Sequence, residues 1–542
     1  MQNGHILSLT ATHCRRLPVH SQPAQIFPYP AESGKEKARR ATPSLGKGDG
    51  KVTMQSGMMS VSARSLRAVK GVLLGSAAGL AVAGGAQAAD LPTKKAAPVE
   101  YVRICSAYGA GFFYIPGTDT CLRVGGRARF EATYVQPLIR GDNMGYRALG
   151  RLNIDARTQT GYGTLRAFVR FELASRTGGF LKSGTQERAA NAFSATGVDT
   201  AGRVQQYVNA DKAFIQFAGL TAGRAASFYD FYAHDYEIIA GTLGSDMSST
   251  NVLAYTATFG EGFSATISME DPNFRKNPIF GAPTASVGVN PVDVVQRSRM
   301  PDFVGALRYD AAWGSAQLSA AVHEINTGNF TSNLLTIPHV PSEYGWAVQG
   351  GVKINLPFIA AGDGLYLQGS YGEGATIYTG ISNYNGTYSL TGNPIGGLFN
   401  TSYADAILDP VTGRLSLSKS FTVVGSFLHY WTPEWRSAIF GSYGEIEFNK
   451  TARARTAAAG IGGLTVADAA TSALLRDASQ IVAGASLIWS PVKDLDIGVE
   501  GLYTQVGVKN GRVLDPNRPG STTATVKDGD TFQVRMRVQR DF

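Results

Sequence analysis

The chain has 542 residues, of which 17% are charged and 44% hydrophobic, with 64 glycines and only 3 cysteines. This composition is too apolar for a disordered chain, and the length excludes a small disulfide-stabilised domain. The net charge of +9 would favour an anionic partner, but 11 Lys+Arg against 3 Asp+Glu lie in residues 1–88, which leaves residues 89–542 a net charge of +1. We therefore expect no nucleic-acid partner.

The segment that ends at Ala88 has the order of a secretory signal peptide. A basic stretch (60–70) precedes a short apolar run (71–86), and the small residues Ala86 and Ala88 follow. The run is shorter than the roughly 20 residues that a membrane-spanning helix needs, and it is mostly Ala and Gly. We therefore predict export and cleavage after Ala88.

A polar stretch precedes this signal, although an export signal belongs at the start of a chain. We therefore expect translation to begin at Met54, Met58 or Met59. The predicted organisation is an extension that is not genuine or is disordered, a signal-peptide region, a mature N-terminal segment and a main domain, over residues 1–53, 54–88, 89–121 and 122–542.

The exported chain keeps two cysteines, Cys105 and Cys121. A pair in an exported protein is most simply a disulfide, here closing a loop of about 15 residues and worth about 3 kcal/mol in the chain-entropy view. A zinc site would need more ligands, and no His lies nearby in the sequence. We expect a structural disulfide, and neither a metal nor a cofactor.

Segments of about 10 residues with alternating apolar and polar side chains follow, separated by Gly, Asn, Asp and Pro. Alternation of period two places one set of side chains on each face of a strand. No run of 18 apolar residues occurs, so no transmembrane helix is expected. Candidate strands are 122–135, 147–160, 164–174, 208–218, 221–226, 251–259, 263–270, 302–311, 315–325, 345–356, 364–373, 419–431, 435–448, 479–489, 494–505 and 531–542.

Alternation also fits a soluble sandwich, but the connections favour an outer-membrane barrel. Short turns, such as 161–163 and 260–262, alternate with long segments, such as 174–207 and 374–418. Such barrels have short turns at one rim and long loops at the other, and single-chain examples have an even number of strands. We predict an all-β fold, a closed transmembrane antiparallel β-barrel of about 16 strands.

Aromatic residues support this prediction. Four tryptophans lie within a few residues of a short turn, as in the aromatic girdle of a membrane barrel: Trp313, Trp431, Trp435 and Trp489. The last strand ends at the carboxyl terminus with Phe542, and only Arg540 interrupts its apolar face, near the rim where it can reach water. This ending resembles the terminal signal read by the outer-membrane barrel assembly machinery.

The stretch ADLPTKKAAPVEYVRICSAYGAGFFYIPGTDTCLRVGG (89–126) resembles the mature amino terminus of the alphaproteobacterial porins, and the resemblance extends in coarse layout over the whole mature chain. It implies a general-diffusion porin: a sixteen-stranded barrel in the outer membrane, usually a homotrimer, through which ions and small hydrophilic solutes diffuse. It also implies that the third long loop folds into the lumen and narrows the channel.

That loop should be residues 227–250, which contain acids but no Lys or Arg: Asp230, Asp235, Glu237 and Asp246. Arginines occupy the polar faces of the first three strands and the position just before the loop: Arg123, Arg127, Arg129, Arg157, Arg166, Arg170 and Arg224. An Arg that faces lipid at mid-depth costs about 2–4 kcal/mol, so we expect all of these side chains in the lumen. Loop acids opposite wall arginines would create a field across the narrowest point.

Two other functions remain as alternatives. An enzyme is not expected, because no catalytic motif occurs in a suitable setting, and the pair Glu445 and Glu447 shares one strand face, where lumen lining is the simpler reading. A secreted or surface β-rich binding protein, such as an adhesin, would share the export signal and the alternation. It would need neither Phe542 nor the tryptophan girdle.

Overall fold

The computed structural model of the chain describes residues 103–136, 143–178, 205–247, 249–281, 293–294, 296–327, 340–381, 403–515 and 523–542. The predicted extension and signal peptide, residues 1–88, lie outside the described residues. Within these ranges no helix is long and apolar enough to cross a membrane.

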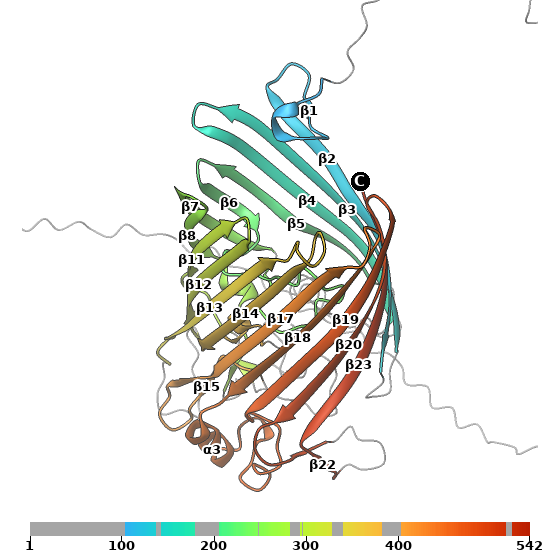
Figure 1. The fold of residues 1–542 in the computed structure, drawn as a ribbon. Coiled ribbons are helices and arrows are strands. Elements are labelled where there is room, and N and C mark those ends of the chain that lie inside the picture. Colours follow the sequence, from blue (N-terminus) through green and yellow to red (C-terminus); the bar gives the residue numbers. More distant parts are fainter. Residues whose placement is uncertain are drawn as a thin grey trace, which may run out of the picture. The chain divides into compact units, whose positions relative to one another are not determined.

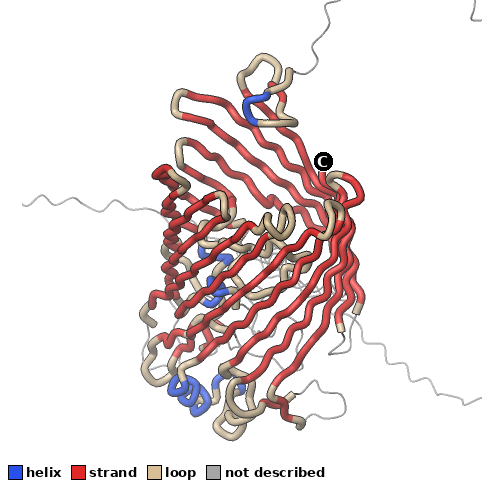
Figure 2. The backbone as a smooth tube through the Cα atoms, viewed as in Figure 1, coloured by secondary structure: helices blue, strands red, loops and turns tan. Residues whose placement is uncertain are grey.

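A closed barrel of antiparallel strands dominates the fold (Figures 1 and 2). Of the seventeen strands in its sheet, sixteen pair in chain order and the last, β23, returns to the first, β2, from Arg127↔Asp541 to Val135↔Gln533. Closure leaves no strand with an unpaired edge. Unpaired backbone N–H and C=O groups would be costly in lipid, because no water is present there to bind them. The barrel strands are β2 (Thr120–Val135), β3 (Met144–Thr160), β4 (Gly163–Gly178), β5 (Gln205–Phe217), β6 (Leu220–Ala225), β7 (Thr250–Gly260), β8 (Phe263–Glu270), β11 (Asp302–Ala311), β12 (Gly314–Ile325), β13 (Glu343–Asn355), β14 (Gly364–Glu373), β17 (Lys419–Tyr430), β18 (Trp435–Glu447), β19 (Ala478–Val492), β20 (Leu495–Val508) and β23 (Asp528–Asp541).

These strands confirm the predicted barrel, and their bounds agree with the predicted ones to within a few residues. Several short elements of the connecting segments were not predicted. They are β1 (Phe113–Tyr114), β9 (Ile279–Phe280), β10 (Asp293–Val294), β15 (Ala406–Leu408), β16 (Leu415–Leu417), β21 (Val513–Leu514), β22 (Thr525–Val526), the helix α3 (Lys450–Ala458) and the 3-10 turns η1 (Ser106–Tyr108), η2 (Pro272–Phe274), η3 (Thr376–Thr379) and η5 (Ile461–Gly463).

Tight hairpins join the strands at the end of the barrel that carries the C-terminus, whereas α3 and β22 lie at the opposite end (Figure 1). In the β7–β8 hairpin Glu261 and Gly262 have φ of 48° and 89°, and in the β5–β6 hairpin Ala218 and Gly219 have φ of 48° and 87°. Two successive positive φ values give the turn whose twist matches that of paired strands, which explains the glycines. The predicted division into short-turn and long-loop ends is confirmed.

Burial along the strands is the reverse of that in a soluble protein. Arg535 is 1% exposed and Asp211 is fully buried, whereas Leu173 and Val208 are 59% and 75% exposed. Polar side chains therefore point into the barrel and apolar ones point outward. Only a barrel that is surrounded by lipid gains from this arrangement.

Tryptophans mark the short-turn end of the outward face. Trp313 and Trp431 lie in or beside hairpins, and Trp435 stacks on Trp489 with ring centroids 5.8 Å apart. All four rings are substantially exposed. Exposed amphipathic rings gathered at the short-turn end are the arrangement that an aromatic girdle at the headgroup level needs.

A small N-terminal lobe precedes the barrel at the same end. The predicted disulfide between Cys105 and Cys121 is present, with the two Cα atoms 5.9 Å apart. Strand β1 pairs with the start of β2, and Phe112 packs beside the disulfide. The lobe also reaches the inner wall, because the Arg157 guanidinium lies 4.9 Å from the centre of the Phe112 ring.

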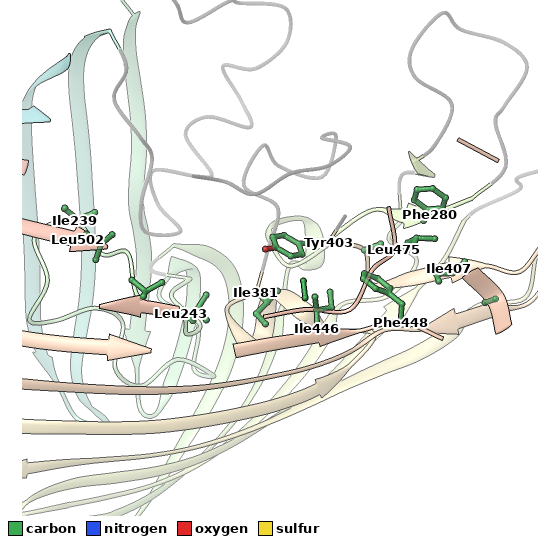
Figure 3. Packing of buried hydrophobic residues seen from close by; sticks show 14 of the residues in the cluster. Ile239, Leu243, Phe280, Ile381, Tyr403, Ile407, Ile446, Phe448, Leu475 and Leu502 are labelled. Atoms are coloured by element: carbon green, nitrogen blue, oxygen red, sulfur yellow. The ribbon is translucent and has the colours of Figure 1, made fainter. Parts of the chain in front are cut away.

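An apolar core lies inside the barrel rather than around it. Ile239 and Leu243 from the segment between β6 and β7 pack with inward side chains of β18, β19 and β20 and with residues of the long loops (Figure 3). Two of the long loops also build a four-stranded sheet, β10-β9-β15-β16, in which β9 and β15 are parallel. Much of the inner surface near β18–β20 is therefore covered by packed chain.

Candidate functional site

The segment between β6 and β7, residues 226–249, runs across the inside of the barrel, and we call it the inner loop. Tyr232 N donates to Gln368 Oε1 of β14 at 3.0 Å, and Leu243 N donates to Ser442 Oγ of β18 at 2.8 Å. Near its middle, the amides of Ile238 and Ile239 both donate to the Glu500 carboxylate of β20 at 2.6 Å. A loop held by inward side chains of distant strands lies within the lumen.

A β-bulge fixes the end of the inner loop. The register of β4 and β5 shifts between Arg170 and Phe171, so Asp211 has no partner in the ladder. Because of this bulge, the neighbouring residues Asp211 and Lys212 both lie on the inner face of the strand. Asp211 is fully buried. Its carboxylate accepts a hydrogen bond from Ser249 Oγ at 2.6 Å, just before β7 begins.

The inner loop faces a wall of arginines. Strands β2, β3, β4 and β23 direct their polar positions inward, and their burial pattern alternates accordingly. We call this surface the arginine wall, and it consists of Arg127, Arg129, Arg147, Arg151, Arg157, Arg166, Arg170, Arg176, Arg535 and Arg537. It includes five of the seven arginines predicted to line the lumen.

Arg127 and Arg129 lie where the barrel closes. Arg127 makes a bidentate pair with Asp541, with Nε–Oδ1 and Nη2–Oδ2 distances of 2.5 and 3.0 Å. Arg129 binds the neutral side-chain oxygen of Gln539 at 2.7 and 2.9 Å. Both contacts join residues from opposite ends of the barrel sequence.

The other three predicted wall arginines, Arg157, Arg166 and Arg170, form a second group. Arg157 and Arg166 share Asp155, at 2.8 and 3.0 Å. Arg170 donates to Asn153 Oδ1 at 2.8 Å and lies 3.3 Å from Asp211. The wall therefore combines cations with carboxylates, and Asp211 connects it to the inner loop.

Two of the predicted arginines lie elsewhere. Arg123 is exposed on the part of β2 that continues beyond its ladder with β23. Arg224 pairs in register with Ala213 and Asn251, on the outward face, where it donates to the Ala210 carbonyl at 2.9 Å. Its prediction as a lumen residue is wrong, because β6 (Leu-Thr-Ala-Gly-Arg-Ala) is short and has small residues on both faces, so its sequence does not show which face is inward.

The four acids of the inner loop have different surroundings. Asp230 pairs with Arg275 Nη2 at 2.9 Å. Glu237 is buried and accepts hydrogen bonds from Gly241 N at 2.8 Å and from Thr242 N at 3.1 Å, within its own loop. These two acids hold the fold of the loop.

The other two acids differ in exposure. Asp246 is buried 3.3 Å from His234 Nδ1. Asp235 is the exposed acid of the inner loop, and it accepts a hydrogen bond from Tyr366 OH at 2.7 Å. Asp235 reaches the open space of the lumen, but the protein around its carboxyl group displaces enough water to raise its pKa above the ordinary value. This desolvation outweighs the Tyr366 hydrogen bond and the attraction of Lys353, which both lower the pKa.

The imidazole of His234 is charged near neutral pH. Burial by itself lowers its pKa, but Glu237 and Asp246, together with the Thr242 carbonyl that it contacts at 2.8 Å, raise it to about 9. A protonated histidine beside two carboxylates stabilises the turn of the loop.

A cavity of about 290 Å³ brings the two surfaces together. Asp235 and Glu237 line it from the inner loop, and Arg127, Arg129 and Arg537 line it from the arginine wall. Arg436 and Asp496 complete it from β18 and β20, with their charged groups 2.7 Å apart. Charges of both signs therefore border the same space inside the barrel.

The sequence reasoning missed the most buried part of the wall. Glu131 is fully buried and shares its carboxylate among Arg147, Arg537 at 2.6 Å and Arg129 at 4.0 Å. Arg535 lies beside it and donates to Thr133 Oγ1 at 3.0 Å. These residues occupy the inward, alternate positions of β2, β3 and β23. Applying the same alternation to the last strand would have identified them from the sequence.

Glu445 and Glu447 do not line the lumen. They share the outward face of β18 with Trp435 and Ile439, and Lys509 contacts both, with Nζ 2.9 Å from Glu447. The prediction is wrong because both faces of β18 are largely apolar, its inward face packing against the inner loop. The pair lies at the long-loop end of the strand.

The family model described as the porin subfamily matches residues 90–534. The chain belongs to this porin family. Porin Omp2b of Brucella suis is 32% identical over 338 residues, which cover 60% of this chain and 79% of that protein. Porin Omp2b of Brucella abortus is 32% identical over 332 residues, with the same coverage.

Two solved structures resemble the porin chain at low identity. The outer membrane channel DcaP of Acinetobacter baumannii has a TM-score of 0.48 and 16% identity, covering 79% of this chain and 99% of that one. The anion-selective porin from Comamonas acidovorans has a TM-score of 0.41 and 13% identity, covering 78% and 100%.

Family and fold together fix the cellular role in outline. This porin is a β-barrel of the bacterial outer membrane and serves as a channel for diffusion.

Proposed function

We propose that the porin forms a water-filled channel for passive diffusion of ions and small hydrophilic solutes, and that its narrowest point is a charged eyelet between the inner loop and the arginine wall. The observation that carries this proposal is the 290 Å³ cavity, which both surfaces line. Water-filled barrels of this class have polar interiors, in keeping with the inward arginines.

The eyelet acts on solutes through its field. Asp235 supplies the negative side of the cavity, and Arg127 and Arg129 supply its positive side. Arg166 and Arg170 extend the positive surface along the arginine wall. Apolar walls around water focus such a field. Dipolar solutes align with it, whereas apolar solutes must give up water that the fixed charges hold. Glu237, Asp230 and Asp246 shape the loop and contribute less to this field, because their carboxylates are engaged within the protein.

We further propose a homotrimer in outer-membrane lipid that is assembled by the barrel assembly machinery through its last strand. The exposed Phe542 ring supports this reading, since the residue's backbone closes the ladder with Gly126 at 2.8 and 3.1 Å while its side chain remains accessible. An accessible aromatic ring at the end of the last strand is a feature that the assembly machinery could bind.

The test is conductance in a planar bilayer. We expect stepwise insertions in triplets, and a shift of reversal potential or single-channel conductance in Arg127→Ala and Arg166→Ala. The control is Arg512→Ala, whose exposed side chain donates to Thr525 Oγ1 at 3.1 Å in a long loop. Channels with unchanged values in both wall variants would overturn the eyelet. Protein that never conducts and fractionates as soluble would overturn the channel in favour of a surface binding protein.

A further inference from the structure

The cavity between the inner loop and the arginine wall has two chemically different sides. Its cationic side is lined by Arg127, Arg129 and Arg537. Its other side is apolar and is formed by two residues of the inner loop and two inward residues of β17 and β19: Tyr236, Ile238, Leu428 and Ile488. A space with apolar walls and a few convergent polar groups is the usual form of a small-molecule site.

The strand register places the two sides at the same height of the barrel. Ile488 of β19 lies opposite Gly498 of β20, and Gly498 lies opposite Arg537 of β23. A side chain at Gly498 would come within 2.9 Å of Ile238 Cδ1, so the glycine lets the inner loop approach the wall here. Two strand spacings of about 4.8 Å separate Ile488 from Arg537, so a solute of about 10 Å reaches both sides.

Arg129 is the cation of the cavity that lacks a close carboxylate within the described part of the chain. Its Nε and Nη2 donate to the neutral side-chain oxygen of Gln539 at 2.9 and 2.7 Å, and its Nη1 lies 4.0 Å from Glu131. The carboxylate partners of Arg127 and Arg537 lie at 2.5 and 2.6 Å. A guanidinium has five N–H donors, so Arg129 keeps donors for the carboxylate of a solute.

The acids of the cavity are held by groups of the protein. Asp496 pairs with Arg436 at 2.7 Å, and Asp235 accepts a hydrogen bond from Tyr366 OH at 2.7 Å. Glu237 is buried and binds amides of its own loop. An anion that enters the cavity is therefore drawn toward Arg129 and away from Asp235, which orients it.

We propose that the cavity binds small organic anions with a compact apolar body, such as an aromatic carboxylate. The carboxylate binds Arg129, and the apolar body contacts Ile488, Leu428 and the ring of Tyr236. The cavity volume of about 290 Å³ suits a small solute. The site rests on the proposed eyelet and names the class of solute that the eyelet favours, because such a solute matches both sides at once.

The test uses benzoate as the probe, on the full mature protein in detergent and in planar bilayers. Equilibrium dialysis of labelled benzoate, corrected for empty micelles, measures binding without any need for conductance. The reduction of ion current by benzoate then measures binding in the open channel. We expect benzoate to bind more tightly than acetate, which lacks the apolar body, and more tightly than benzamide, which lacks the charge.

Two variants separate the two sides of the cavity. Arg129→Gln should weaken benzoate binding about tenfold or more, because charge-assisted hydrogen bonds to the carboxylate are lost, and should leave benzamide binding unchanged. Ile488→Ala should weaken benzoate binding about fivefold through lost apolar contact. The matched controls are Arg512→Gln in a long loop and Ile481→Ala on the outward face of β19, and neither should change benzoate binding.

Equal binding of benzoate by the wild type, Arg129→Gln and Ile488→Ala would overturn the site. Equal affinity for benzoate and acetate, or for benzoate and benzamide, would overturn it as well. Channels that conduct while the protein binds no benzoate would refute the site and leave the eyelet intact. Protein that binds benzoate but never conducts would support the site and refute the channel.

Discussion

The barrel has two inner surfaces that differ in kind although both belong to one continuous sheet. On β2–β4 and β23 the arginine wall is polar and ion-paired, with Glu131 at its centre. On β18–β20 the inward side chains, among them Phe440, Val482 and Leu502, pack against the inner loop and the long loops. The outward face of both halves is largely apolar, with Glu445 and Glu447 at the long-loop end of β18 as exceptions. The half formed by β18–β20 therefore fixes the inner loop largely by apolar packing. The arginine wall supplies Arg127, Arg129 and Arg537 to the cavity, to which β18 and β20 add the pair Arg436 and Asp496.

The largest effect should come from removing the buried centre of the arginine wall. Glu131→Leu leaves Arg147 and Arg537 without their shared carboxylate, and breaking such a pair costs about 3–5 kcal/mol. Urea unfolding in detergent measures the loss. The control is Glu447→Leu, whose half-exposed carboxylate pairs with Lys509 and should cost less than about 1 kcal/mol. Equal losses would contradict the buried role of Glu131.

The apolar half is tested next. Leu502→Ala removes a 3% exposed side chain that packs against Gly241 of the inner loop, and we expect a loss of about 3 kcal/mol in unfolding free energy. Single-channel current should also become noisier, because the loop loses packing near its middle. Leu487→Ala on the outward face of β19 is the matched control. Quiet, wild-type current in Leu502→Ala would show that the loop needs only its hydrogen bonds.

His234 makes stability depend on pH. Its folded pKa of about 9 lies above the unfolded value of about 6.5, so the stabilisation is complete below pH 6.5 and is lost as pH rises through 9. The loss is about 3 kcal/mol on this scale. Unfolding free energies from pH 6 to 10 should fall for the wild type relative to His234→Gln. Parallel profiles would mean that His234 is neutral in the folded barrel.

The smallest effect should come from the long-loop rim of the apolar half. Arg455 of α3 pairs with Asp409 at 2.6 Å, but its side chain is 38% exposed. Arg455→Gln should therefore cost less than about 1 kcal/mol, measured by the same unfolding experiment. A loss above 2 kcal/mol would mean that the rim holds the apolar half together.

The two halves also differ in how well the sequence predicts them. Arg127, Arg157 and Arg166 alternate with apolar residues, so their inward direction follows from parity. On β18, Phe440 and Ile439 are both apolar but face opposite sides, so parity could not place Glu445. Residues that pack a loop inside a barrel look like residues that face lipid, because both environments are apolar.

Local sequence patterns could not predict which residues of the site contact each other. Arg127 meets Asp541 across 414 positions of sequence, and the β5 bulge turns Asp211 to Ser249. The acids of the inner loop were found as a group, but their division into loop-holding residues and the exposed Asp235 depends on how the loop folds.

The sequence by itself determined the strands, the closure of the barrel, the disulfide and the inward charge of the arginine wall, because these follow from alternation, spacing and residue type along the chain. Only the tertiary structure decided which charges meet and which half of the lumen is filled. Those features depend on the register between strands and on the path of one loop, and both are set by contacts between residues far apart in the chain.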